Sequence, residues 1–226
     1  DSEIGLKQPI QEIAKILEDY PKCYFHVDCT QALGKVPVDL TGVDLASFSA
    51  HKIYGLKGVG LLIKKENIQI DPIIHGGKST TIYRSGTPAL PLMVSMMKAM
   101  KLIISDVDKN YKYISSLNKK IKDRLRDYSL VHINSTENSI PYIINFSINS
   151  IKPETFIHAM EEYGIYISTR SACSTSDVSK AVDSIYHDKT RASHSIRVSL
   201  SYKNTMEEVL EFNRVFDIVY NKLLLK

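Results

Sequence analysis

Three short apolar segments follow one another early in the chain, and each of them ends in polar residues. They are YFHVD, VDLASFS and VGLLIKK, at residues 24–28, 43–49 and 59–65. A helical spacing of apolar residues over 9–20 precedes the first segment, and TQALGK, after it, has the length of a short helix. Strands that alternate with helices are typical of an α/β fold. The sequence therefore predicts a mostly parallel sheet in this part of the chain.

The second half of the chain has a different pattern. Helical periodicity runs from about residue 91 to residue 128, with an interruption near 105–110. A predicted helix and three predicted strands follow, at residues 155–164 and at residues 142–148, 165–168 and 195–201. We therefore predict two domains, residues 1–105 and residues 106–226, of which the second is a small α+β domain.

The end of the chain carries the pattern of a capped amphipathic helix. Thr205 and Glu208 have the spacing of a capping box, in which each side chain bonds the other residue's backbone N–H. The apolar residues that follow at helical spacing are Val209, Phe212, Phe216 and Val219. The sequence predicts a last helix with one buried face.

Charge and cysteine content narrow the classes of function. The 29 basic and 25 acidic residues give a formal net charge of +4 and are interspersed, so the chain lacks a basic patch for nucleic acid. The three cysteines are odd in number and form no CxxC pair, which argues against a disulfide framework and favours the cytoplasm. No apolar stretch has membrane-spanning length, and no signal-peptide pattern is present. We expect neither direct nucleic-acid binding nor membrane binding.

Asp28 and Gln31 come directly after the first predicted strand. Ligands of open α/β sheets bind outside the carboxyl ends of strands, and a carboxylate there could pair with a cationic ring nitrogen. The alternative is that Asp28 only caps the turn that follows it.

The second predicted strand leads into SFSAHKIYGLKGVG, which contains Ser49, His51 and Lys52. A hydroxyl, an imidazole and backbone N–H groups at the end of a strand suit a phosphate. A lysine in a tight, apolar or cationic site can form a Schiff base with a carbonyl. The alternative is a surface lysine in a glycine-rich loop.

Two further residues could carry chemistry. Cys173 lies in the polar segment STRSACSTSD, where Arg170 would favour the thiolate. Arg197 interrupts an otherwise apolar strand, and its guanidinium could bind a carboxylate with two hydrogen bonds. The alternatives are a cysteine without a role and a structural ion pair.

An acid after one strand, a lysine after the next, a loop cysteine and a strand arginine together suggest a pyridoxal-phosphate enzyme that uses a thiol. The chain resembles the class I cysteine desulfurases, the NifS/IscS-like group of fold-type I pyridoxal-phosphate enzymes. The resemblance rests on motifs that occur in the family's order, DSEIG, HVDCTQALGK, SFSAHKIYGLKGVG, HGG with YRSGTP, STRSACSTS and HSIRVSLS. It implies the C-terminal part of a large α/β domain with a mostly parallel sheet, followed by a small α+β domain.

The resemblance implies roles for the residues around the cofactor ring. Lys52 would bind pyridoxal 5'-phosphate as a Schiff base and later move the α-proton of the substrate. Asp28 would pair with the pyridinium nitrogen, and Gln31 would hydrogen-bond the phenolic oxygen. Cys173 would be the nucleophile that accepts sulfur as a persulfide.

The resemblance also implies which residues hold the phosphate and the substrate. Ser49 and His51 would bind the phosphate, and Thr87 would reach the phosphate of a partner subunit's cofactor. Arg197 would bind the carboxylate of L-cysteine, and the residue at position 1 would lie near it. The family usually has Asn where this chain has Asp1, and an aspartate would repel a carboxylate.

The family's chains are longer at the N-terminus, and the additional part carries the aromatic residue that stacks on the pyridine ring. We therefore expect this chain to be a fragment that binds the cofactor poorly by itself. The expected partners are a sulfur-acceptor protein that serves iron–sulfur cluster assembly or tRNA thiolation, and a second copy of the full-length chain in a homodimer. Two alternatives are a related enzyme of the same fold, such as a selenocysteine lyase or an aminotransferase, and a non-catalytic module that docks sulfur acceptors.

Overall fold

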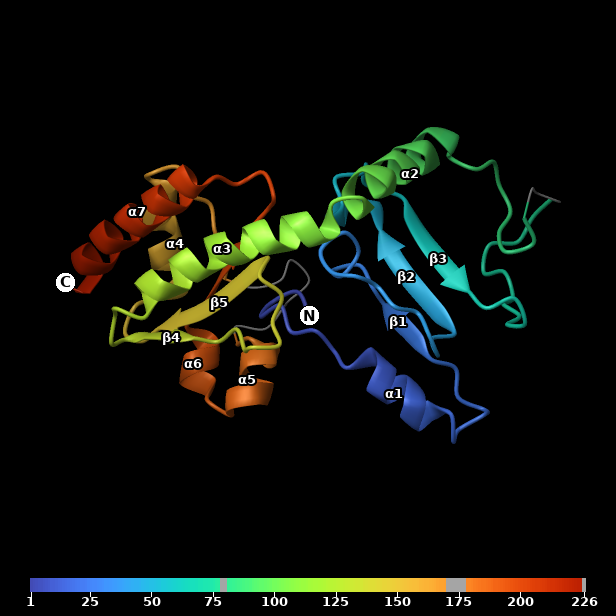
Figure 1. The fold of residues 1–226 in the computed structure, drawn as a ribbon, viewed down its shortest axis with the longest axis horizontal. Helices are drawn as coiled ribbons and strands as arrows, with labels where there is room; N and C mark the ends of the chain where they lie inside the picture. Colours follow the sequence, from blue (N-terminus) through green and yellow to red (C-terminus); the bar gives the residue numbers. More distant parts are fainter. Residues whose placement is uncertain (78–80, 170–177, 225–226) are drawn as a thin grey trace. The chain divides into compact units, whose positions relative to one another are not determined.

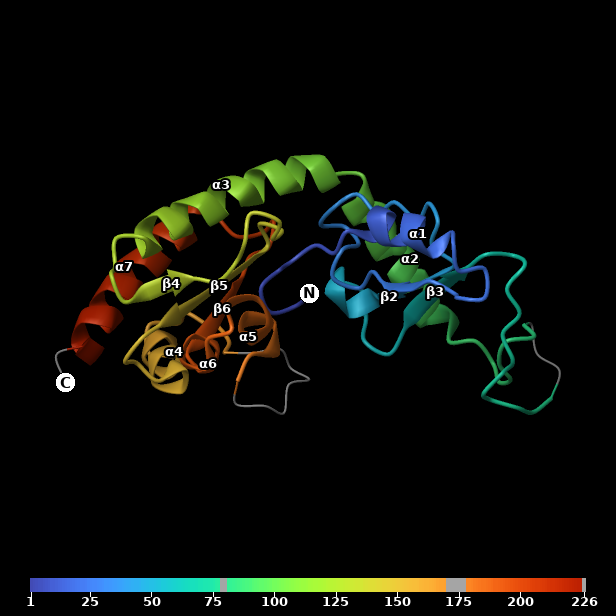
Figure 2. The ribbon, with the colours of Figure 1, turned by 90° about the horizontal axis from the view of Figure 1, so that it is seen from below.

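The computed structural model describes residues 1–77, 81–169 and 178–224, which form two compact units. One unit comprises Pro9–Val107. The other comprises Asp1–Gln8 together with Asp108–Lys226, so the start of the chain packs with its C-terminal part. Figure 1 labels the elements of both units, and Figure 2 shows them from a second direction. Among the described residues, no helix is long and apolar enough to cross a membrane.

The unit Pro9–Val107 contains a small sheet and the helices around it. Its elements are α1 (Ile10–Leu17), β1 (His26–Asp28), β2 (Leu45–Ser49), a 3-10 turn (Ala50–Lys52), β3 (Gly60–Lys64) and α2 (Leu90–Ile104). The predicted first helix and the three predicted strands are thus confirmed, with shorter strands than the apolar segments indicated.

The prediction of a mostly parallel sheet is wrong for the described strands of this unit. The sheet has the order β1-β2-β3, in which β1 and β2 are parallel but β2 and β3 are antiparallel. Parallel pairing requires a crossover of about a dozen residues or more, usually through a helix. The segment between Ser49 and Gly60 holds only a 3-10 turn and a loop, so the chain returns antiparallel to β2.

The segment TQALGK is a run of turns and not the short helix that the sequence suggested. The N–H of Leu33 still reaches back to the carbonyl of Cys29, as in one helical turn. Gly34 then adopts a φ of +72°, in the left-handed region where helices end. A Cβ at this position would lie 2.7 Å from side-chain atoms of Ile103, so α2 packs directly on the turn.

The core of this unit lies between the sheet and α2. Its buried residues come from β1 and β2, from the turn after β2, and from α2, and include Val27, Ala46, Phe48, Ala50, Ile53, Met96, Ala99 and Ile103. Ala50 and Ile53 flank Lys52 and are almost fully buried. The backbone that carries Lys52 is therefore fixed by packing on both sides.

The other unit contains an antiparallel sheet. Its strands are β4 (Val131–Ile133), β5 (Ile143–Ile148) and β6 (Ser195–Ser199), in the order β4-β5-β6. Its helices are α3 (Val107–Leu125), α4 (Pro153–Glu161), α5 (Lys180–Tyr186), α6 (Lys189–Ser193) and α7 (Met206–Leu224). Every residue of β5 is buried, because the strand is central and helices cover both faces of the sheet. The predicted α+β arrangement is confirmed within this unit.

One predicted strand is absent from this sheet. Residues 165–168 form no strand, and Ser168 makes a single bridge to Arg197 of β6. Two backbone hydrogen bonds form this bridge, from Ser168 N–H to the Arg197 carbonyl at 3.1 Å and from Arg197 N–H to the Ser168 carbonyl at 2.6 Å.

The capping box of the last helix is confirmed. Thr205 N–H donates to Glu208 Oε2 at 3.0 Å, and Glu208 N–H donates to Thr205 Oγ1 at 3.2 Å. The predicted buried face of α7 is also confirmed, and Phe216 in its middle is fully buried. This ring contacts the rings of Phe146 and Phe156, which come from β5 and α4. The capping box thus fixes where α7 begins, and the ring contacts of Phe216 fix the helix against β5 and α4.

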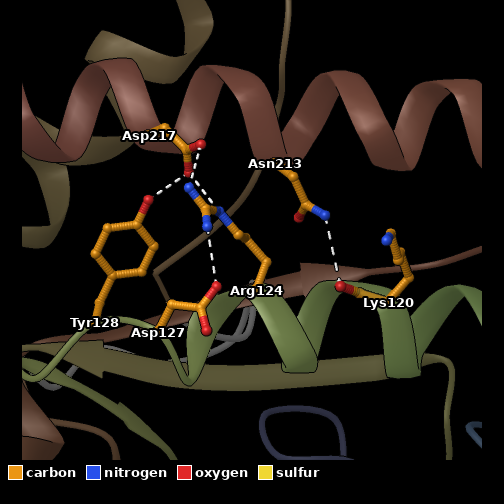
Figure 3. Close-up of polar contacts among 6 residues, drawn as sticks. All are labelled: Lys120, Arg124, Asp127, Tyr128, Asn213 and Asp217. Atoms are coloured by element: carbon orange, nitrogen blue, oxygen red, sulfur yellow. Dashed lines mark hydrogen bonds and ion pairs between the residues drawn. The ribbon is translucent and has the colours of Figure 1, made fainter.

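Polar contacts join α3 to α7 beside this core, as Figure 3 shows. Arg124 of α3 donates to both carboxylate oxygens of Asp217 on α7, at 2.9 and 2.5 Å. Tyr128 donates its hydroxyl hydrogen to the same carboxylate, and Asp127 accepts from the other side of the guanidinium. The two-point contact fixes the register of one helix against the other.

Candidate active site

Asp28 and Gln31 lie at the carboxyl end of β1 and in the turn that follows it. Asp28 is exposed, and its Oδ1 accepts the N–H of Thr30 at 2.9 Å. A hydrogen bond from the Thr30 side chain lowers the pKa of Asp28 below its usual value, and it outweighs the opposite effect of burial. The carboxylate caps the turn, as the alternative interpretation expected, and it is ionised at neutral pH. The local role leaves the exposed carboxylate available to a cationic ligand.

Ser49, His51 and Lys52 follow one another at the carboxyl end of β2. Ser49 Oγ and His51 Nδ1 lie 2.8 Å apart and share a hydrogen bond. His51 and Lys52 are exposed, while Ala50 before them and Ile53 after them are buried. The structure thus presents a hydroxyl, an imidazole and an amine on one short turn that is fixed by the core.

Gly60 allows β3 to approach this turn closely. Gly60 pairs with Ser49, and a Cβ on Gly60 would lie 2.7 Å from the carbonyl oxygen of Phe48. Any other residue would push β3 away from the end of β2. The glycines of SFSAHKIYGLKGVG therefore include at least one that keeps the strand end in place.

Lys35 also belongs to this region, although the sequence motifs predict no role for it. Its Nζ donates to Gln31 Oε1 at 2.6 Å. Burial, and in second place the charge of Lys52, lower the pKa of Lys35 to about 8. The structure therefore brings Gln31, Lys35 and Lys52 into one neighbourhood. The i,i+4 spacing of Gln31 and Lys35 is the signal that could have indicated their contact.

Thr87 lies in the exposed loop before α2. Cys173 and Arg170 lie outside the described residues. Of the other two cysteines, Cys23 is exposed and Cys29 is buried. Burial, and then the charge of Asp28, raise the pKa of the Cys29 thiol, which makes it a packing residue rather than a nucleophile.

Arg197 lies in the middle of β6, in the unit that also contains the first residues of the chain. Its Nη1 donates to the carbonyl of Ser2 at 3.0 Å, whereas its buried Nε has no hydrogen-bond partner among the described residues. Burial lowers the pKa of Arg197, and the charge of Glu3 opposes that effect. A half-buried guanidinium with an unused donor is suited to an anionic ligand.

Asp1 lies on the same unit and is exposed. Its Oδ1 accepts two backbone hydrogen bonds, from Glu3 N–H at 2.9 Å and from Ile4 N–H at 2.8 Å. Two such bonds stabilise the negative charge locally. The Asp1 carboxylate therefore caps the turn at the start of the chain by accepting backbone hydrogen bonds from its own segment.

The donor set of the unit Pro9–Val107 fits pyridoxal phosphate. A hydroxyl–imidazole pair suits a phosphate, an exposed amine suits an aldehyde, an ionised carboxylate suits a ring N–H, and a carboxamide suits a phenolic oxygen. All of these groups lie at the carboxyl ends of β1 and β2, which are parallel neighbours. This is the edge of an α/β sheet where ligands bind.

Comparison with known proteins gives a family. Residues 1–212 match the family model described as aminotransferase class-V. A NifS/IcsS protein homolog of Lactobacillus delbrueckii subsp. bulgaricus is 37% identical over 227 residues, which is 97% of this chain and 59% of that protein. The cysteine desulfurase IscS of Dictyoglomus turgidum is 36% identical over 232 residues, which is 99% of this chain and 58% of that protein.

Solved structures agree with this result. A NifS-like protein from Rickettsia africae superposes with a TM-score of 0.87 at 30% identity, over 97% of this chain and 59% of that one. Another NifS-like protein gives a TM-score of 0.86 at 33% identity, over 96% of this chain and 58% of the other. The chain thus spans a little under three fifths of the length of these relatives. The chain belongs to the aminotransferase class-V family and is a homologue of the NifS/IscS cysteine desulfurases.

Proposed function

We propose that this chain is part of a cysteine desulfurase that holds pyridoxal phosphate on Lys52 and receives sulfur on Cys173. The observation that carries the proposal is the turn after β2, where Ser49, His51 and Lys52 lie together at a strand end in a member of this family. The unit Pro9–Val107 would then form the remainder of the cofactor-binding domain, and the other unit, which includes residues 1–8, would form the small domain.

The residues of the first unit would hold the cofactor. Pyridoxal phosphate, which this family uses, supplies an electron sink for the negative charge left on the α-carbon of an amino acid. Ser49 Oγ and the ring of His51 would donate hydrogen bonds to the phosphate. The ionised carboxylate of Asp28 would keep the ring nitrogen protonated, and Gln31 would donate to the phenolic oxygen.

Lys52 and Cys173 would carry the chemistry. The Nζ of Lys52, as a free amine, would remove the α-proton of L-cysteine and later return a proton. The Cys173 thiolate would attack the sulfur of the substrate, so that an S–S bond forms as the C–S bond breaks. L-cysteine and the Cys173 thiol would thus give L-alanine and a Cys173 persulfide, a balance that needs no external oxidant.

Arg197 would bind the carboxylate of L-cysteine. The unused donor of its guanidinium and the cost of burying its charge both favour an anionic partner. The hydrogen bonds from Glu3 N–H and Ile4 N–H hold the Asp1 carboxylate against its own backbone segment.

Two macromolecular partners belong to the proposal. A sulfur-acceptor protein, either a scaffold for iron–sulfur clusters or a tRNA-thiolation enzyme, would take the persulfide sulfur from Cys173. A second copy of the complete chain would form a homodimer in which Thr87 reaches the phosphate bound by its partner.

The test uses the protein expressed from its full reading frame, with the variants Lys52→Ala and Cys173→Ser. We expect Lys52→Ala to lose the visible absorbance of the lysine–cofactor adduct and to lower alanine formation from cysteine by roughly 10²–10⁴-fold, the usual contribution of a proton-transfer residue. We expect Cys173→Ser to keep the absorbance and to form no protein persulfide.

Lys57→Ala is the matched control, because Lys57 is an exposed lysine of the same glycine-rich loop. It should keep both the absorbance and the activity. If Cys173→Ser forms alanine and sulfide at the wild-type rate, Cys173 is not the nucleophile. If the unaltered protein shows no adduct with pyridoxal phosphate, the proposed function is wrong.

A further inference from the structure

Lys35 is a partly buried lysine that lies next to the candidate cofactor residues and has no role in the proposed reaction. Its backbone is held where Gly34 packs against Ile103 of α2. The backbone turns from Cys29 onward, and the Lys35 side chain contacts Gln31, four residues earlier in this turn. A lysine on a surface loop would normally extend into water, because burial of an ammonium costs free energy. The hydrogen bond to Gln31 offsets part of the free-energy cost of burying the Lys35 ammonium.

The contact with Gln31 has only one chemically possible orientation. The ammonium of Lys35 has three donors and no acceptor, so it can bond only the oxygen of the Gln31 carboxamide. Oε1 lies 2.6 Å from Nζ, within charge-assisted hydrogen-bond distance. The carboxamide nitrogen then has to point away from Lys35. An isolated glutamine amide, in contrast, can turn over and present either atom to a ligand.

The surroundings of Lys35 support a connection with the cofactor site. The charge of Lys52 is the second cause, after burial, of the lowered pKa of Lys35, so the two amines are electrostatic neighbours. With a pKa of about 8, Lys35 is still mostly protonated at pH 7 and keeps its donors. The pair of Gln31 and Lys35 therefore lies within electrostatic range of the residue that would bind the cofactor.

We propose that Lys35 is a positioning residue that fixes the Gln31 carboxamide with its NH₂ group as the donor toward the phenolic oxygen of the cofactor. Lys35 does not touch the cofactor in this arrangement and acts through Gln31. Without it, the carboxamide of Gln31 would turn freely, and in one of its two orientations would present an acceptor to an electron-rich oxygen. The inference rests on the proposed function for the identity of the ligand.

The first test needs no cofactor. Side-chain amide NMR of the cofactor-free protein would compare the wild type with Lys35→Met and Lys35→Arg. We expect an ordered Gln31 NH₂ group in the wild type and in Lys35→Arg, which keeps a cationic donor. In Lys35→Met its order parameter should fall below about 0.6, the range of flexible groups. Equal order in the wild type and Lys35→Met would overturn the proposal.

The second test is a double-mutant cycle on the affinity for pyridoxal phosphate, measured by adduct absorbance with Lys35→Met, Gln31→Ala and the double variant. We expect Lys35→Met to weaken binding roughly 3- to 10-fold, as for the loss of one hydrogen bond. The same change should have no further effect in the Gln31→Ala background. An equal loss in both backgrounds would mean that Lys35 acts by charge alone, which would overturn the proposal.

Lys22→Met is the charge-matched control, because Lys22 is an exposed lysine of the same unit. It should leave both the Gln31 amide and the cofactor affinity unchanged. Failure of the proposed function has a different signature, since the unaltered protein would then form no adduct with pyridoxal phosphate. Failure of the inference would leave that adduct intact and change only the comparison between variants.

Discussion

Burial of the Arg197 guanidinium costs folding free energy, and the same group is proposed to bind the substrate carboxylate. Its guanidinium is half-buried in a strand, bonds the Ser2 carbonyl, and leaves Nε without a partner among the described residues. Arg197→Met should therefore leave the midpoint of thermal unfolding equal or higher, because a buried charge is replaced by an apolar chain of similar length. The KM for L-cysteine should rise roughly 10- to 100-fold, because hydrogen bonds to charged groups are worth about 1.5–3 kcal/mol. Thermal unfolding and steady-state kinetics measure the two effects.

Arg197→Lys separates charge from geometry in that experiment. Lysine keeps the positive charge but cannot form a two-point contact, so its KM should lie between those of the wild type and Arg197→Met. A wild-type KM in Arg197→Met would show that another group binds the substrate carboxylate.

At the scale of residues, the sequence allowed the prediction of site residues that are neighbours along the chain. Ser49, His51 and Lys52 could be predicted as a group because they are almost contiguous and follow a strand. For Lys35 the sequence offers only the i,i+4 spacing to Gln31, because the packing of the neighbouring Gly34 against Ile103 of α2 is a contact between residues distant in sequence. The structure tests the location of these residues, and their roles stay predictions.

At the scale of elements, the contact between α3 and α7 makes stability depend on pH. Burial raises the pKa of Asp217, but the hydrogen bonds from Arg124 and Tyr128 lower it by more. The net result is a pKa below the usual value of an aspartate. The pKa of an aspartate in an unfolded chain is about 3.9. The stability that the carboxylate contributes is therefore fully present above that pH and is lost as the pH falls through the lower folded pKa. Asp217→Asn should lower the free energy of unfolding by about 1 kcal/mol at pH 7, since the partners are partly exposed. It should also make the free energy of unfolding fall less steeply as the pH is lowered.

Denaturant unfolding between pH 7 and pH 3 measures this effect. Asp123→Asn is the control, because Asp123 pairs with Lys119 and Arg126 on the exposed side of α3. It should change the unfolding midpoint little at any pH. An acid limb that is as steep in Asp217→Asn as in the wild type would assign the pH dependence to other carboxylates.

Elements with a strong local signal were the predictable ones. The capping box of Thr205 and Glu208 and the apolar face of α7 act within a few residues, and both predictions are confirmed. The direction of β3 depends on the length of its connection to β2, which apolar pattern alone does not report. The segment 165–168 has strand-like composition, but within the described part of the chain it pairs with a strand at a single residue, Arg197. Strands need pairing that the sequence does not specify.

At the scale of the whole molecule, the chain begins in one unit, builds the other, and returns. The segment Asp1–Gln8 pairs with the C-terminal unit through a bridge between Leu6 and Ser139. Glu3 adds two contacts, since its carbonyl accepts from Asn145 at 3.1 Å and its carboxylate accepts from Ser179 at 2.5 Å. The sequence could not indicate this arrangement, because the segment has no long-range signal of its own.

Ile4 is the apolar anchor of this segment, and it gives the last prediction. It is 1% exposed and packs in a cluster with Val182 of α5 and Ala192 of α6. Ile4→Ala should destabilise the C-terminal unit by about 2–4 kcal/mol, through lost apolar burial and the cavity left behind. Residue-resolved hydrogen exchange should show faster exchange in β5, β6 and α5 and no change in β1 and β2.

Ile16→Ala is the matched control, because Ile16 is 62% exposed on α1 of the other unit and should change the exchange of neither set of elements. Equal acceleration in both units after Ile4→Ala would mean that the units unfold as one cooperative body, and the segment would then stabilise the whole chain rather than its C-terminal part.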